Sequence, residues 1–277
     1  MVDKKKALIL MENVIKELEN EKLGLIYKGA FVLRLLAEKK KVTTPSRLTR
    51  DIDANIVKKD VTYEYFIDLI EKIVSKLGHD YLSIEIADNV PYPNMFFIEA
   101  VDYRNKSEGE RVFGIDFNNT PNPWCCEYQL DNGVVILGQT MEKIFVDKML
   151  SVSTVKVERR PWDIFDMYVL SFMEGLFIKN IVPILKAQDK ELEDFKQLSY
   201  PTDRLKSVWK RRRGIVDRPD FKEMLGRVRD LCTPFMVKEP NLAGKWHVDD
   251  GNWQEQTYLN PETGEDKLLS KSTVFVE

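Results

Sequence analysis

The sequence is poor in the residues from which disulfide-linked and zinc-binding proteins are built. It has three cysteines in 277 residues, two of them adjacent in a predicted loop (Cys125 and Cys126), and only two histidines. These numbers support neither a disulfide framework nor a zinc ligand set, so we expect a cytoplasmic protein. No segment approaches the ~18 consecutive apolar residues of a membrane-spanning helix, and we expect no membrane partner.

A strong net charge and the common nucleotide-binding glycine motifs are absent as well. Lys and Arg number 42 against 45 Asp and Glu, a net charge of −3. No global positive field therefore attracts nucleic acid, and such binding requires a local patch. The chain has no Gly-x-Gly-x-x-Gly, P-loop or Gly-x-Ser-x-Gly sequence, which argues against dinucleotide binding, Walker-type nucleotide binding and serine hydrolase chemistry.

Hydrophobic periodicity divides the chain into two halves. Helical spacing at 4–19 and 61–77 and strand-like runs at 51–57, 82–87, 95–103 and 111–117 predict a mixed sheet with flanking helices in residues 1–139. Helical periods at 141–151, 162–178, 180–197, 203–213 and 219–231 predict a helical domain in residues 140–240. Residues 241–277 contain turn sequences at 249–251 and 260–264 and are predicted to form an extension with a hairpin on the surface, which includes Trp246. The fold class is therefore α+β.

Three aspartates on predicted strands carry the chemical signal. Asp51 and Asp53 are two residues apart, so they project from the same face of a strand while Ile52 points into the core. Asp116 lies on a later strand between apolar neighbours. Carboxylates on adjacent strands could hold two Mg²⁺ ions about 3.5–4 Å apart. A lone Asp-x-Asp is also common on solvent-facing strands, and that interpretation stays open.

A glycine precedes the second predicted helix, which begins at Phe31. Gly29, followed by Ala30, lies where a glycine lets backbone N–H groups approach a phosphate, because a helix N-terminus favours negative charge. The order of glycine, helix, Asp-x-Asp and a later apolar-Asp-apolar strand favours a metal site over an ordinary Asp-x-Asp on a solvent-facing strand.

These elements resemble a known family. Gly29-Ala30, Asp51-Ile52-Asp53 and Ile115-Asp116-Phe117 are similar to the three elements of the polymerase-β-like nucleotidyltransferase superfamily. Residues 142–150 and 159–168 resemble the second-half motifs of abortive-infection nucleotidyltransferase toxins of the AbiEii type. The resemblance covers residues 20–175.

The resemblance implies an Mg²⁺-dependent enzyme that transfers a nucleoside monophosphate from an NTP and releases pyrophosphate. Its implied metal ligands are Asp51, Asp53 and Asp116, and its implied catalytic and nucleotide-binding residues in the second half are Lys148, Asp163, Arg159 and Asp166. Gly29 and Ala30 would lie against the nucleotide phosphates. The acceptor in such families is often RNA such as a tRNA 3′ end, and the toxin, acting in phage defence, is paired with a separately encoded antitoxin.

Two residues depart from the family pattern. Ala30 stands where a glycine or serine is usual, so a hydroxyl that could contact phosphate is missing. Trp162 stands where a lysine or arginine is typical, and Arg159 or Arg160 could supply that charge. Two alternatives therefore stay open: transfer to a protein or small molecule instead of RNA, and a non-catalytic binding module that kept the fold.

A basic run in the second half is the candidate RNA surface. It comprises Lys206, Lys210, Arg211, Arg212 and Arg213. Helical spacing could align several of these side chains to neutralise phosphates, although a solvated basic face is the alternative. Trp209 beside them could stack on a base, but we expect it to pack in the core.

Overall fold

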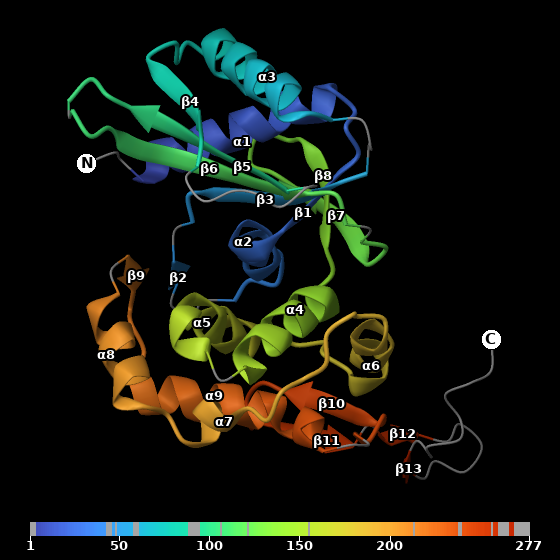
Figure 1. Ribbon diagram of the computed structural model, residues 1–277. Helices are drawn as coiled ribbons and strands as arrows, with labels where there is room; N and C mark the ends of the chain where they lie inside the picture. Colours follow the sequence, from blue (N-terminus) through green and yellow to red (C-terminus); the bar gives the residue numbers. More distant parts are fainter. Residues whose placement is uncertain are drawn as a thin grey trace. The chain divides into compact units, whose positions relative to one another are not determined.

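The computed structural model describes residues 4–42, 46–47, 49–57, 61–87, 95–105, 107–120, 122–154, 156–212, 214–237, 240–255, 257–259 and 266–268. The chain, drawn in Figure 1, divides into two compact units. The first unit comprises Met1–Leu36 and Leu48–Thr140, and the second comprises Ala37–Arg47 and Met141–Glu277. The second unit thus takes a short segment that precedes most of the first unit in the sequence.

The first unit is built on a seven-stranded mixed sheet with the order β4-β5-β6-β3-β1-β8-β7. Its strands are β1 (Leu25–Lys28), β3 (Asp51–Ile56), β4 (Leu82–Ile86), β5 (Met95–Asp102), β6 (Glu110–Asn118), β7 (Cys125–Gln129) and β8 (Val135–Gln139). β3 pairs in parallel with β6, and β1 in parallel with β8. The remaining neighbours are antiparallel. The central strands β1, β3 and β6 carry the predicted acidic residues or lead into the predicted glycine.

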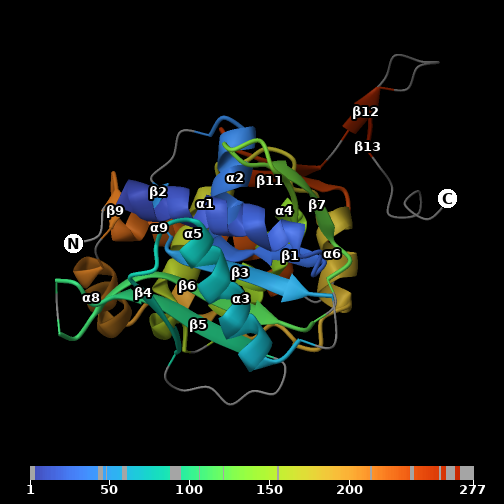
Figure 2. The same ribbon diagram turned by 90° about the horizontal axis from the view of Figure 1, so that it is seen from above.

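Helices cover both faces of this sheet. α1 (Lys4–Asn20) and α3 (Tyr63–Lys76) lie side by side on one face, and α2 (Gly29–Lys39) starts on the other (Figures 1 and 2). α3 begins at Thr62, whose hydroxyl accepts the Tyr65 N–H in an N-cap. Phe66 of α3 contacts the rings of Phe96 and Phe117, with centroids 5.6 and 5.1 Å apart.

This aromatic contact fixes which way the acidic strands face. Phe117 and Ile115 alternate with Asp116 along β6, and Ile52 and Ala54 alternate with the β3 aspartates. All four apolar residues are buried. Successive strand residues point to opposite faces, so the aspartates point away from α3. Burial of the apolar set therefore sets the direction of the polar set.

The second unit is mainly helical. Its elements are β2 (Ser46–Arg47), α4 (Met141–Ser153), the 3₁₀ helix η1 (Val157–Arg159), α5 (Pro161–Leu170), α6 (Ile178–Lys186), α7 (Lys196–Ser199), α8 (Asp203–Arg211), β9 (Ile215–Val216), α9 (Phe221–Cys232) and η2 (Thr233–Met236). α5 packs against α4 and α9. β2 and β9 form a two-residue antiparallel pair.

Two short hairpins follow. β10 (Gly244–His247) pairs with β11 (Asn252–Glu255), and β12 (Thr257–Leu259) pairs with β13 (Asp266–Leu268). The first encloses the predicted turn at 249–251, whereas the turn sequence at 260–264 lies outside the described residues. The first hairpin is not superficial, because Trp246 is completely buried and its indole N–H donates to the Ser171 carbonyl at 2.8 Å. The Trp246 ring also lies 5.7 Å from that of Trp253, its cross-strand partner.

The predicted α+β class with a mixed sheet and a helical second half is confirmed. Three local predictions are wrong. Cys125 and Cys126 begin the edge strand β7 and do not form a loop. The helix predicted over 162–178 ends at Leu170, and the one predicted over 180–197 ends at Lys186. The first break contains Gly175, whose φ of +103° is incompatible with a helix. No helix in the described part of the chain is long and apolar enough to cross a membrane.

Replacing Trp246 tests whether the hairpin is part of the core. We expect Trp246→Ala to lower the free energy of unfolding by about 3–5 kcal/mol, because it removes a buried indole and its hydrogen bond. Urea denaturation measures this loss. Tyr200→Ala is the control, since that ring is 78% exposed and its removal should change stability by less than about 0.5 kcal/mol. Equal effects of the two substitutions would contradict the assignment.

Candidate functional site

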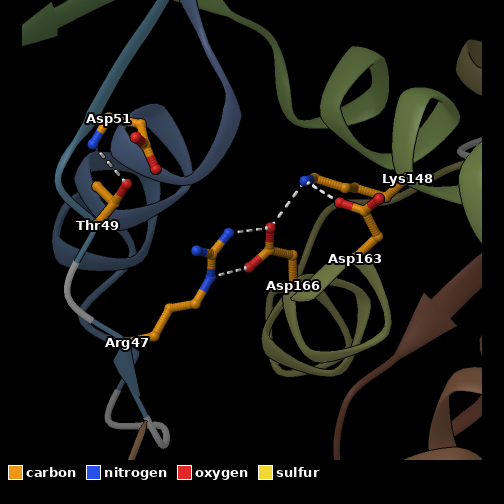
Figure 3. Close-up of polar contacts among 6 residues, drawn as sticks. All are labelled: Arg47, Thr49, Asp51, Lys148, Asp163 and Asp166. Carbon is orange, nitrogen blue, oxygen red and sulfur yellow. Dashed lines mark hydrogen bonds and ion pairs between the residues drawn. The ribbon is translucent and has the colours of Figure 1, made fainter. Parts of the chain in front are cut away.

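Strand register brings the three predicted aspartates onto one face of the first unit's sheet. In the parallel pair β3–β6, Asp53 is the direct partner of Asp116, and Asp51 is the partner of Gly114. Direct partners point to the same face, so the three carboxylates share the face opposite α3. The Thr49 hydroxyl accepts the backbone N–H of Asp51 at 3.1 Å and fixes the start of this strand (Figure 3).

Gly29 lies directly against this acidic face. It follows Lys28, the β1 partner of Asp53, and starts α2 with a φ of +70°. A Cβ at this position would collide with Oδ2 of Asp53. Glycine is therefore required for two reasons: the backbone conformation and the closeness of the carboxylate. The Ala30 methyl is buried in the core, so any contact of Ala30 with a ligand would be through its backbone.

A pocket of about 230 Å³ opens over the acidic face. All of its lining residues belong to the first unit, and they include the three aspartates together with Glu99, Arg111 and Gly114. Arg111 donates to Asp51 Oδ1 at 2.5 Å and lies 2.7 Å from Glu99 Oε1. Neither Glu99 nor Arg111 was among the predicted site residues.

Among the predicted metal ligands, Asp53 and Asp116 form a pair that faces the pocket. Within the described ranges, no group of three or more His, Cys, Asp or Glu side chains is arranged to hold a metal ion. The paired Asp53 and Asp116 still provide oxygen ligands of the kind that Mg²⁺ uses together with substrate phosphates. The space cleared at Gly29 lies beside one of them. The residues therefore fit an ion whose remaining ligands come from a bound nucleotide.

A second polar cluster lies within the second unit (Figure 3). Arg47 of β2 makes a bidentate ion pair with Asp166 of α5, at 2.8 and 2.9 Å. Lys148 of α4 lies 2.8 Å from Asp166 and 2.6 Å from Asp163. The Ser151 hydroxyl donates to Asp163 at 2.5 Å. The structure thus brings three predicted site residues, Lys148, Asp163 and Asp166, into mutual contact, and adds Arg47 and Ser151.

Burial and charge act in opposite directions within this cluster. Burial alone would raise the pKa of Asp166, whose side chain is 1% exposed, but the positive charges of Lys148 and Arg47 outweigh burial and lower it. Burial alone would lower the pKa of Lys148, but Asp166 and Asp163 outweigh it, and that pKa is raised. Asp166 and Lys148 therefore stabilise each other's charged form.

Trp162 lies beside this cluster, at the position where the family pattern has a basic residue. The guanidinium carbons of Arg47 and Arg212 lie 4.8 and 5.6 Å from the centre of its ring. Two arginines from distant parts of the sequence thus bring positive charge to Trp162. Arg159, proposed from sequence for this purpose, is exposed at the end of η1.

The predicted RNA-binding residues belong to one short helix and the residues after it. Lys206, Lys210 and Arg211 of α8 are exposed, and Arg212 is half-buried. Lys206 and Lys210 are four residues apart and share a helix face. Arg213 lies outside the described residues. Trp209 is 3% exposed and stacks on Phe165, so it is a core residue and not a base-stacking platform.

Known proteins match this chain at the level of the fold. No family model matches the sequence, and no curated protein is significantly similar. A "putative nucleotidyltransferase from H. pylori" has a TM-score of 0.54 and 17% identity, over 83% of this chain and 95% of that one. JHP933 from Helicobacter pylori has a TM-score of 0.54 and 15% identity, over 84% of this chain and 93% of that one. Both likenesses lie below 20% identity, so they show a common fold, in agreement with the predicted α+β class.

A further solved structure is MenT4, nucleotidyltransferase toxin Rv2826c from Mycobacterium tuberculosis H37Rv. It has 9% identity and a TM-score of 0.41, over 80% of this chain and 87% of that one. A TM-score this low does not establish a common fold.

The contact between Gly29 and Asp53 can be tested with a pair of glycine variants. Gly29→Ala and Gly78→Ala both force alanine into a positive φ (+70° and +76°), which costs about 1–2 kcal/mol. Only Gly29→Ala also places a methyl group against Asp53, since nothing lies within 4 Å of a Cβ at Gly78. We expect Gly29→Ala to lose about 1–3 kcal/mol more in urea unfolding. Equal losses would mean that the Asp53 carboxylate moves aside without cost.

Neutralising Asp166 tests the second cluster. We expect Asp166→Asn to lower the free energy of unfolding at pH 7 by about 3 kcal/mol, because Arg47 and Lys148 lose a buried counter-charge. The folded state lowers the pKa of Asp166. Its contribution is therefore complete above the unfolded value of about 3.9 and is lost as pH falls through the folded value.

Urea unfolding at pH 7, 5 and 3 measures this dependence. The difference between wild type and Asp166→Asn should be constant at pH 7 and 5 and narrow at pH 3. Asp189→Asn, at an exposed carboxylate of the same unit, should differ from wild type by less than about 0.5 kcal/mol. A difference that widens toward acid would contradict the predicted ionisation.

Proposed function

We propose that this chain is an Mg²⁺-dependent nucleotidyltransferase that transfers NMP from an NTP to an acceptor hydroxyl and releases pyrophosphate. The observation that carries the proposal is the register of β3 and β6, in which Asp53 faces Asp116 with Asp51 on the same side. The fold, shared with solved structures of which one is described as a "putative nucleotidyltransferase", supports it. So does the approach of the Gly29 backbone to Asp53.

The residues of the first unit would bind and orient the nucleotide. Asp53 and Asp116, with Asp51 beside them, would hold Mg²⁺ together with phosphate oxygens of the nucleotide, and the ion would supply the charge that activates a hydroxyl and neutralises the leaving pyrophosphate. The backbone N–H groups at Gly29 and Ala30, at the start of α2, would donate to a phosphate oxygen. Phosphoryl transfer depends chiefly on positioning and charge stabilisation, and these side chains and amides provide both.

In this proposal, residues of the second unit would contact phosphates or position the side chains that do. Lys148 would contact nucleotide phosphates, as the family pattern implies, by exchanging its ion pair with Asp163 or Asp166 for one with a phosphate. Asp166 would remain paired with Arg47 and keep α5 fixed. Asp163 would orient Lys148, and Arg159, which is exposed, is available to a phosphate.

We further propose RNA, such as a tRNA 3′ end, as the acceptor and a toxin of the AbiEii type, with a cognate antitoxin, as the biological role. The support is the resemblance of the motifs and the exposed basic side chains of α8, Lys206, Lys210 and Arg211, which could neutralise RNA phosphates.

Transfer of label tests the proposal. Purified protein is incubated with Mg²⁺, each α-labelled NTP in turn and total tRNA, and the products are resolved on a denaturing gel. We expect label in tRNA with one preferred NTP. Asp53→Asn should reduce labelling at least 100-fold, because it removes a charged metal ligand. Asp102→Asn, at a carboxylate of the same sheet outside the pocket, should keep most of the activity.

The other outcomes separate the alternatives. Label on protein or on a small molecule would keep the reaction and reject the RNA acceptor. Absence of label together with absence of a thermal shift by Mg²⁺ and NTP would reject the enzyme and leave a non-catalytic module.

A further inference from the structure

An arginine, Arg111, lines the acidic pocket between two of its carboxylates. Asp51 of β3, Gly114 of β6 and Glu99 of β5 form a row across three adjacent strands, since Gly114 is the register partner of both acids. The guanidinium of Arg111 lies over this row and bridges the two carboxylates, 2.5 Å from Asp51 and 2.7 Å from Glu99. The positive charge of Arg111 therefore already lies beside Asp51, one of the proposed metal ligands.

The backbone is shaped to place this side chain there. Along β5–β6 the register shifts between Ala100 and Val101, so that Ala100 pairs with Phe113 but Val101 pairs with Arg111. In regular alternation Arg111 would point to the opposite face from Gly114, and this bulge turns it onto the acidic face. The guanidinium of Arg50 donates to the Arg111 carbonyl at 2.8 Å and holds the bulged segment.

Gly114 provides the space for the guanidinium. A Cβ at position 114 would collide with Nη2 of Arg111. The backbone N–H of Gly114 donates to the Arg50 carbonyl at 2.7 Å, so the strand itself cannot move away. The β-bulge directs the Arg111 side chain to this face, Gly114 leaves room for it, and Asp51 and Glu99 bind its guanidinium.

We propose that Arg111 is an internal counter-cation that competes with the metal for Asp51 and transfers to the nucleotide phosphates when the NTP binds. This inference rests on the proposed function. The guanidinium stays charged at every relevant pH, and its planar fork suits phosphate as well as carboxylate. Metal alone must displace Arg111 from Asp51 without offering it a new partner, whereas an NTP offers phosphate oxygens.

Metal and nucleotide consequently bind cooperatively. By linkage, the factor by which the nucleotide tightens metal binding equals the factor by which the metal tightens nucleotide binding. Both side chains of the Arg111–Asp51 pair are partly exposed, at 36% and 43%, so the pair can open without unfolding the strands. The role of Arg111 is thus to keep the acidic pocket from filling with metal in the absence of substrate.

Binding of Mn²⁺, followed by the EPR signal of the free ion, tests this role without measuring catalysis. The titration is made with and without a non-hydrolysable α,β-methylene NTP. We expect wild type to bind Mn²⁺ weakly alone and about tenfold more tightly with the analogue, within the ~5–150-fold typical of such coupling. Arg111→Gln should bind Mn²⁺ alone about tenfold more tightly than wild type and lose most of the effect of the analogue.

Two further variants make the result specific. Arg104→Gln removes the same charge from an arginine that is ion-paired with Asp102 of the same sheet outside the pocket, and should behave as wild type. Arg111→Lys keeps the charge but has no fork to bridge Asp51 and Glu99, and should give intermediate values. It also serves if Arg111→Gln does not fold.

The failures are distinguishable. Equal Mn²⁺ affinities in wild type and both Arg111 variants, with binding abolished by Asp53→Asn, would overturn the counter-cation and leave the metal site intact. If Arg104→Gln raised the Mn²⁺ affinity as much as Arg111→Gln, the effect would come from net charge alone, which would also overturn the proposed role of Arg111. No Mn²⁺ binding in wild type under either condition would overturn both this inference and the proposed metal-dependent function.

Discussion

Repulsion among carboxylates is the constraint on which the acidic face depends. Asp53 and Asp116 are register partners, and Asp51 lies two residues away on the same face, so their negative charges are held close by the strands themselves. The strands cannot separate, because the alternating apolar residues of β3 and β6 are buried on the opposite face. Positive charge near these acids offsets such repulsion, and Arg111 brings it to Asp51 and to the neighbouring Glu99.

In the second unit, a buried carboxylate is likewise paired with positive charge. Asp166 is almost completely buried and has two cationic partners, Arg47 and Lys148. A buried pair broken on one side leaves an uncompensated charge, at a cost of several kcal/mol. A partly exposed pair such as Arg111–Asp51 is worth only about 0–1 kcal/mol. The difference in exposure makes the Arg47–Asp166 pair a fixed part of the core, whereas the Arg111–Asp51 pair is open to exchange.

The parts of this arrangement that a local sequence pattern encodes could be predicted. Asp51, Asp53 and Asp116 are flanked by apolar residues in strand alternation, and Gly29 precedes a helix, so their positions follow from a period of two and from the start of a period of 3.6. The grouping of Lys148 with Asp163 and Asp166 came from the motif, and three-residue spacing places the two acids on one side of α5.

The remaining parts depend on pairing and on tertiary packing. Arg111 is 60 residues from Asp51 and reaches it only because a bulge in β6 reverses its direction, and a bulge leaves no mark in hydrophobic alternation. Arg47 is 119 residues from Asp166. The helix end at Leu170 was missed because apolar residues continue past it. The end at Lys186 was missed because residues 187–193 are mostly good helix formers and contain neither glycine nor proline. Trp246 was expected in a superficial hairpin, since nothing in its neighbours predicts a partner at Ser171.

Sequence and structure therefore carry different kinds of information about this site. The proposed metal chemistry would require acids at fixed strand positions, so these residues must be specified one by one. The cationic side chains need only lie close to the acids in the folded chain, so they can belong to any helix or strand that passes nearby. A search for the acids along the chain succeeds for this reason, whereas their partners appear only in three dimensions. The glycines at 29 and 114 connect the two, since each clears the space into which a charged side chain from elsewhere fits.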